Sequence, residues 1–149
     1  MNKNTETVLL ITLIFVLLGS LILTHLAEAK HLNTEKFYQT IHCNQLGGQM
    51  EVIMPDRSRC DCLTETYAIE HDFANSPKMY EGVSQALLYS AHTGKKPGLA
   101  LIVEDKKDAD IAMKRLRLIL KRWMLPIHIW LIINDGSDNI TIEDLGLLY

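Results

Sequence analysis

The centre of this chain contains two neighbouring stretches rich in aliphatic, aromatic and cysteine residues, Arg59-Cys60-Asp61-Cys62-Leu63 and Tyr67-Ala68-Ile69-Glu70-His71-Asp72-Phe73. Both are short and separated by the polar residues 64–66, so we expect two strands, 59–63 and 67–73. A turn at Pro-Asp-Arg-Ser, residues 55–58, separates them from a third expected strand over 49–54. Strands this close in the chain form a three-stranded antiparallel meander.

Helices flank the meander, and strands and helices alternate after it. Residues 33–35, Asn-Thr-Glu, can cap a helix that Gly47-Gly48 ends, and Pro77 is typical of a first helical turn. The unbroken apolar run 99–103 favours a strand buried on both faces. We therefore expect an α/β fold in the order α-β-β-β-α-β-α-β, with a mixed sheet flanked by helices. The elements outside the meander are helices 35–46, 78–92 and 108–123 and strands 99–103 and 127–133.

Length and composition allow one domain after an apolar leader. The chain has 149 residues, of which 48% are hydrophobic and 22% charged, and its net charge is −3. These values exclude a multidomain enzyme, a disordered chain and a strongly basic nucleic-acid coat. Residues 30–133 contain all the expected elements. The tail 134–149 carries four acids and no base, and we expect it to be loosely attached.

Residues 1–29 have the pattern of an export leader. A nearly continuous apolar run over 8–23 is followed by Ala27-x-Ala29, the small-x-small form of a signal-peptidase site. Cleavage before Lys30 would leave a periplasmic or secreted domain. The alternative is a signal anchor, in which residues 8–26 would contact the inner membrane as a single pass and hold the domain outside the cytoplasm.

The three cysteines suit an oxidising compartment. Cys60 and Cys62 are too close in one strand to bridge each other easily, so we expect Cys43 to pair with one of them. Cys62 is the partner we take and Cys60 the alternative, and one thiol is left over. We expect no zinc, because the chain lacks a Cys-x-x-Cys element.

Three carboxylates belong to the expected strands 59–63 and 67–73. Glu70 and Asp72 are two residues apart, so both point to the same face, and Asp61 lies on the neighbouring strand. Converging carboxylates suit a hard divalent cation, Mg²⁺ or Mn²⁺. The alternative is that these three carboxylates simply belong to a solvent-exposed strand face without a bound ion. The following helix adds Lys78, Gln85 and Tyr89, and the last two are four residues apart and share a face.

The order and spacing of these motifs resemble the PD-(D/E)XK, or restriction-endonuclease-like, nuclease fold. Asp61, then Glu70, then Gln85-x-x-x-Tyr89 on an α-β-β-β-α-β core is similar to its RecB-like branch. More narrowly, the chain resembles a family of small exported bacterial proteins of unsettled function that is assigned to this fold. That resemblance covers about residues 30–133 and includes Asp61-Cys62-Leu63-Thr64, Glu70-x-Asp72-Phe73-Ala74, Lys78-x-x-Glu81 and Thr93-Gly94-Lys95-Lys96-Pro97-Gly98.

The resemblance implies a role for each motif residue. Asp61 and Glu70 would hold the metal, and Gln85 and Tyr89 would orient the site or contact the substrate backbone. The fold normally supplies a lysine where this chain has Asp72. Lys78 would then be the migrated lysine, and Asp72 would be an extra metal ligand.

The resemblance therefore implies an exported, metal-dependent nuclease that hydrolyses phosphodiesters. The alternative is a catalytically inactive member of the fold that serves as a binding or envelope-associated module. Lys114, Arg117 and Lys121 on the helix 108–123 could meet a nucleic-acid backbone, or could simply be a solvated outer face. The sequence identifies no protein partner.

Overall fold

Six strands form one sheet, and their order across the sheet is their order along the chain. The structure is a computed structural model that describes residues 31–137 and 139–148, and residues 32–149 make up one compact unit. The expected leader, whether signal peptide or anchor, lies outside the described residues. Among the helices that are described, none has the length and apolar character needed to cross a membrane.

The first half of the sheet is the expected meander. Strands β1 (Gln49–Ile53), β2 (Arg59–Leu63) and β3 (Tyr67–Phe73) pair antiparallel, one with the next. Strands β4 (Lys96–Val103) and β5 (His128–Ile133) then continue the sheet parallel to β3. Helices α3 (Met79–Thr93) and α4 (Lys106–Trp123) are the two crossover connections, as expected for parallel neighbours.

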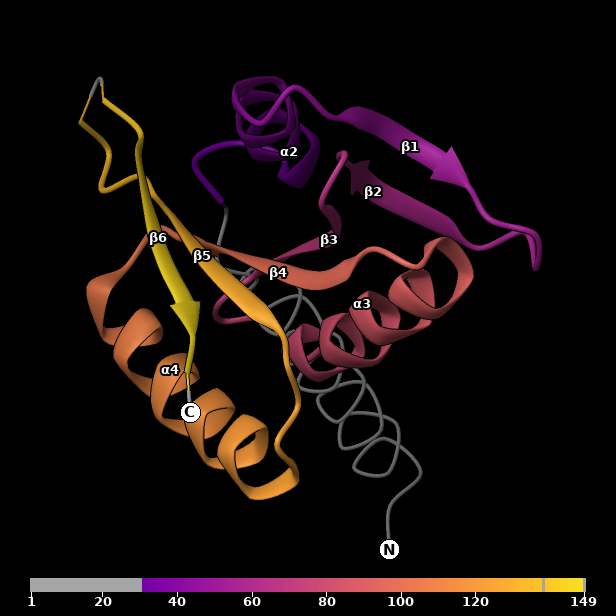
Figure 1. Cartoon of the computed structure of the whole chain (residues 1–149). Coiled ribbons are helices and arrows are strands. Elements are labelled where there is room, and N and C mark those ends of the chain that lie inside the picture. The colour runs from indigo at the N-terminus through magenta and orange to yellow at the C-terminus, as the bar shows by residue number, and fades with distance from the viewer. Residues whose placement is uncertain (1–30, 138, 149) are drawn as a thin grey trace, which may run out of the picture. The chain divides into compact units, whose positions relative to one another are not determined.

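Helices cover both faces of the sheet, with α2 (Glu35–Gln45) on one face and α3 and α4 on the other (Figure 1). Strand β4 explains this division, because its side chains alternate. Leu99, Leu101 and Val103 pack with residues of α3 and α4, whereas Ala100 and Ile102 pack in a second cluster with Tyr38 of α2. The prediction of an α/β fold with a mixed sheet flanked by helices is confirmed.

The expectation of a loosely attached tail is wrong. Residues Thr141–Leu147 form strand β6, which pairs antiparallel with β5 and closes that edge of the sheet. Ile142 and Leu145 pack against the two hydrophobic clusters on opposite faces. An edge strand needs only alternate apolar residues, so its acidic composition is compatible with pairing.

Cys43 of α2 and Cys62 of β2 form the disulfide, with Cα atoms 5.6 Å apart, which confirms the expected pairing. Cys60 is the free thiol and is buried. Strict alternation would put Cys60 and Cys62 on the same face of β2, yet Cys60 packs with Ala68 and Tyr89 in a separate cluster. The pairing of β2 with β3 covers Cys62 and Leu63 but not Cys60, so the two cysteines lie on either side of the point where the strands part.

We predict that the disulfide carries a large share of the stability of the meander. It joins residues 19 apart, so removing it with the Cys43→Ala/Cys62→Ala double variant should lower the free energy of unfolding by about 3 kcal/mol. Urea unfolding of the wild type with and without a thiol reductant measures the same quantity. The reductant should leave the double variant unchanged, and an equally stable reduced wild type would contradict the prediction.

Candidate functional site

Strands β2 and β3 pair over two residues, Cys62 with Ile69 and Leu63 with Ala68. After this pair of contacts the backbones of β2 and β3 no longer pair. A side chain joins the strands instead, because Asp61 Oδ2 accepts a hydrogen bond of 2.8 Å from the amide N–H of His71. The Gln39 side chain of α2 donates to the Asp61 carbonyl at 2.8 Å. The Asp61 carboxylate is thereby held between the two strands.

Glu70 and Asp72 point from β3 toward helix α3. Gly82 is the point of closest approach, since a Cβ atom there would lie 3.0 Å from Leu99 Cδ1, 3.6 Å from Glu70 Cγ and 3.9 Å from Asp72 Oδ2. Lys78, Gly82, Gln85 and Tyr89 follow one another at helical spacing, so they form one stripe of α3. The absence of a side chain at Gly82 lets this stripe lie directly over the two carboxyl groups.

The carboxyl group of Glu70 is buried among other acids. Burial, together with repulsion from Asp61, Glu35, Asp72 and Glu51, raises the pKa of Glu70 to about 9. Among the described residues, its Oε2 atom is buried without a hydrogen-bond partner. The fold therefore keeps a proton on Glu70 at neutral pH unless a cation takes the place of that proton.

The rim of the cluster carries further acids and one lysine. The pKa of Glu35 is raised to about 7, first by burial of its carboxyl group and then by repulsion from Asp61 and Asp72. The rest of the Glu35 side chain is largely exposed. Burial also raises the pKa of Asp72, against the opposing effects of a hydrogen bond from Ser76 and the nearby Lys78 ammonium. Lys78 is exposed at the first turn of α3 and acts on both Glu35 and Asp72.

Tyr89 and Gln85 complete the wall on the side of α3. Tyr89 is 2% exposed and packs beside Cys60. Burial and the negative charge of Glu70 and Asp61 raise the pKa of Tyr89, and a hydrogen bond with Gln85 lowers it. The structure thus brings Asp61, Glu70, Asp72, Lys78, Gln85 and Tyr89 to one place.

Two histidines that the sequence analysis did not assign to the site lie behind it. His71 Nε2 is 3.0 Å from Nδ1 of His42 on α2, and His71 Nδ1 is 3.6 Å from Asp61 Oδ2. Burial and the neighbouring His71 lower the pKa of His42 to about 3, so this ring is neutral. The signal for His42 is its spacing from Tyr38, four residues earlier on the buried stripe of α2.

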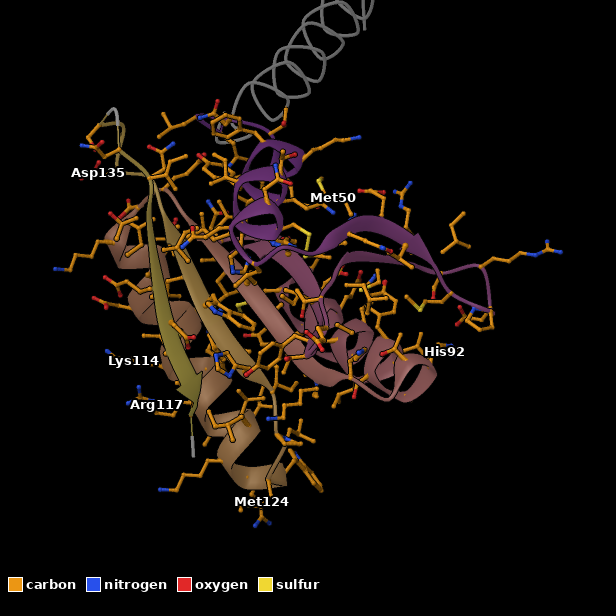
Figure 2. The ribbon with its side chains drawn as sticks, turned by 45° about the horizontal axis from the view of Figure 1, so that its top comes forward. Met50, His92, Lys114, Arg117, Met124 and Asp135 are labelled. Atoms are coloured by element: carbon orange, nitrogen blue, oxygen red, sulfur yellow. A yellow bond between two sulfur atoms is a disulfide. The ribbon has the colours of Figure 1, made fainter. Side chains whose placement is uncertain are left out.

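The basic residues of α4 are not part of this site. Helix α4 packs on the sheet through Ala112, Leu116 and Leu120, and its charged face is exposed. Lys114 and Arg117 project from the outer side of α4, far from His92 at the end of α3 (Figure 2). Lys114, Arg117 and Lys121 therefore lie on a separate surface.

The donor set suits a hard cation, although no metal site is ready-made. In the described ranges 31–137 and 139–148, no three His, Cys, Asp or Glu side chains are already arranged as ligands. Asp61 and Glu70 nevertheless supply carboxylate oxygens, the ligand type that Mg²⁺ and Mn²⁺ prefer, and Glu70 Oε2 lacks a partner. A divalent ion would relieve the repulsion that the cluster builds up.

Comparison of the chain with protein-family models, with curated proteins and with solved structures finds no match in any of the three. The resemblance to a nuclease fold accordingly stays a prediction that rests on the motif residues.

We predict that Glu70 makes stability depend on pH. In the folded chain its pKa is about 9, against 4.5 for an ordinary glutamate, so folding takes up a proton between these values. The contribution of this group is fully present below about pH 4.5 and is lost as the pH rises toward 9. With chelator present, Glu70→Gln should be more stable than the wild type by up to about 5 kcal/mol near pH 8 and similar to it near pH 4.

Urea unfolding across this pH range measures the effect, and Glu81→Gln, which removes the charge of an exposed acid on α3, is the control. The assignment of a buried, protonated Glu70 fails if the wild type and Glu70→Gln differ equally at both ends of the range.

Proposed function

We propose that the chain is an exported, metal-dependent phosphodiesterase that acts on nucleic acid, with its site at the carboxylates of β2 and β3. The observation that carries the proposal is the buried Glu70 carboxyl group, which has an unpartnered oxygen and four other carboxyl groups around it. Such a cluster opposes folding unless protons or a cation neutralise it. Functional sites are where proteins retain such unfavourable arrangements.

In this proposal Asp61 and Glu70 hold the ion, and Asp72 is an additional ligand. The backbone N–H of His71 keeps Asp61 oriented, and the Gln39 side chain fixes the strand that carries it. When bound, Mg²⁺ or Mn²⁺ would activate water and neutralise the charge of the reacting phosphodiester.

The residues of α3 would bind the substrate. Lys78 is exposed at the open end of the stripe, where its ammonium can reach a phosphate oxygen and stabilise developing negative charge. Gln85 and Tyr89 would orient the site or contact the substrate backbone. The basic face of α4, with Lys114, Arg117 and Lys121, is a second surface for a longer nucleic acid.

The proposal includes a restriction-endonuclease-like fold, and the order of the elements supports it. A helix, a three-strand meander, a second helix and a parallel strand bring Asp61, Glu70 and the α3 stripe together. The disulfide between Cys43 and Cys62 is compatible with a periplasmic or secreted location, to which the apolar leader also points. The signal anchor remains the alternative form of export.

A catalytically inactive binding module is the second candidate function. It is favoured by Asp72, which occupies the position where the resemblance implies a lysine. The pKa of Asp72 is raised, so its carboxyl group is either protonated or negatively charged. It cannot supply the positive charge of a lysine. In this case the acids would bind a cation or a basic protein surface without cleaving a substrate.

A cleavage assay on the full chain separates the two candidates. With Mg²⁺ or Mn²⁺, we expect the wild-type chain to cut at least one of single-stranded DNA, duplex DNA and RNA. Asp61→Asn and Glu70→Gln should each lower the rate at least about 100-fold, since loss of a group that only hydrogen-bonds to a metal ligand already costs about 10- to 100-fold. Lys78→Gln should lower it about 100-fold, as expected for a group that stabilises developing charge.

Glu81→Gln and Lys107→Gln make the same charge changes at exposed positions of α3 and α4 and should keep wild-type rates. A wild type that cuts none of the three substrates with either ion would leave the inactive module as the better account. Full activity in Glu70→Gln would remove this carboxyl group from the site.

A further inference from the structure

A second cluster of reactive side chains lies on the other face of the sheet, toward one end of strands β3, β4 and β5. The Tyr67 hydroxyl is 3.2 Å from Nδ1 of His128, and the two ring centroids are 4.8 Å apart. Trp130 stacks on His128 with centroids 4.2 Å apart and contacts Tyr67 edge-on at 5.1 Å. Three aromatic rings from two strands thus form one platform.

Gly98 on the strand between them makes this platform possible. Tyr67 belongs to β3 and His128 to β5, so the rings must meet across β4. A Cβ atom at Gly98 would lie 2.8 Å from Trp130 Cζ3 and 3.1 Å from Ile69 Cγ1. A side chain at this position would therefore push Trp130 away from its place beside His128.

A carboxylate of the last strand orients His128. Asp144 Oδ1 lies 2.6 Å from His128 Nε2 and also accepts a hydrogen bond of 2.9 Å from the Gly146 amide. Strand β6 carries a bulge here, because Ile129 pairs with Gly146 but Trp130 pairs with Asp144. The extra residue turns Asp144 to the face on which His128 lies, and bulges commonly re-aim side chains in this way.

The tautomer of His128 follows from these contacts. A carboxylate accepts a hydrogen bond, so the neutral imidazole carries its proton on Nε2 and presents Nδ1 as an acceptor to the Tyr67 O–H. The oxygen of Tyr67 is then left to accept a hydrogen bond from outside the chain. A base within hydrogen-bond reach of a hydroxyl, oriented by a third group, is the arrangement that protein sites use to activate a hydroxyl.

A cavity of about 380 Å³ opens directly beside this triad. Tyr67, Pro97, Pro126 and His128 give it apolar and aromatic walls, and Lys95 and Lys96 stand at its edge. Lys95 Nζ donates to the Glu65 carbonyl, and Lys96 is exposed. The volume is in the range of small-molecule sites, which are mostly apolar with a few convergent polar groups.

We propose that this cavity binds a small molecule with a flat ring, a hydrogen-bond donor and an anionic group, of which a nucleoside monophosphate is the simplest case. The ring would lie against Tyr67 and His128, its donor would meet the Tyr67 oxygen, and the phosphate would meet Lys96. Asp144 is a positioning residue that acts through His128. The site is on the face of the sheet opposite Glu70, and the proposal does not depend on the proposed function.

Titration of the full chain with adenosine 5′-monophosphate, in nonionic detergent and with chelator, tests the proposal. The readout is the fluorescence of Trp130, which is buried beside His128, in a Trp123→Phe background because Trp123 is 71% exposed. We expect a dissociation constant of about 1 mM or below. Adenosine alone and inorganic phosphate alone should each bind at least about tenfold more weakly, because each lacks one half of the recognised chemistry.

Tyr67→Phe and Lys96→Gln should each weaken binding about 3- to 10-fold, as for loss of one hydrogen bond or one charge. Tyr80→Phe and Lys107→Gln make the same changes at exposed positions and should bind as the parent does. Glu70→Gln should also bind normally, so a failure of the metal site cannot imitate a failure here.

Three results would overturn the proposal. The first is the lack of any fluorescence response up to about 10 mM nucleotide. The second is a response that Tyr67→Phe and Lys96→Gln leave unchanged. The third is phosphate binding as tightly as the nucleotide, since the aromatic platform would then contribute nothing.

Discussion

Strand β3 must bury three ionisable side chains in succession, Glu70, His71 and Asp72, and the rest of the structure is arranged around that constraint. Alternation sends His71 to one face of the sheet and the two acids to the other. On the α2 face, His71 shares a hydrogen bond with His42, whose ring is neutral. The α3 face has the backbone of Gly82 close by and leaves Glu70 Oε2 without a hydrogen-bond partner among the described residues.

Helix α2 holds the acid-bearing strands from the opposite face. Its disulfide to Cys62 and its hydrogen bond from Gln39 to the Asp61 carbonyl fix β2 at the point where β2 and β3 part. Asp61 fills the opening by accepting from His71 N–H. The position of the Asp61 carboxylate thus depends on helix α2, which itself supplies neither Asp61 nor Glu70. Residues that support a site in this way make it rigid.

The sequence predicted most of the fold because its elements carry strong local signals. Thr34 caps α2, Gly47 ends it, and the apolar run of β4 is buried on both faces as expected. Strand β6 was missed because Glu143 and Asp144 interrupt its apolar residues and a bulge sets Ile142 and Leu145 on opposite faces, so the sequence shows no simple alternation. Neither the pairing of β6 with β5, which brings Asp144 to His128, nor the contact of Tyr67 with His128 across β4 has a signal in the sequence.

The convergence of the site was partly predictable for the same reason. Spacing alone placed Glu70 with Asp72, and Gln85 with Tyr89, on common faces. The degree of burial of Glu70, the role of Gly82 and the pair of His42 with His71 depend on tertiary packing.

The proposed function depends on a cation site formed by the carboxylates of Asp61 and Glu70. Thermal unfolding of the full chain with and without Mn²⁺, at about neutral pH, tests it most directly. We predict a higher melting temperature with Mn²⁺ that Asp61→Asn and Glu70→Gln each abolish and Glu81→Gln retains, because an ion that binds only the folded chain stabilises it. An unchanged melting temperature in the wild type, or an equal rise in all three variants, would contradict it.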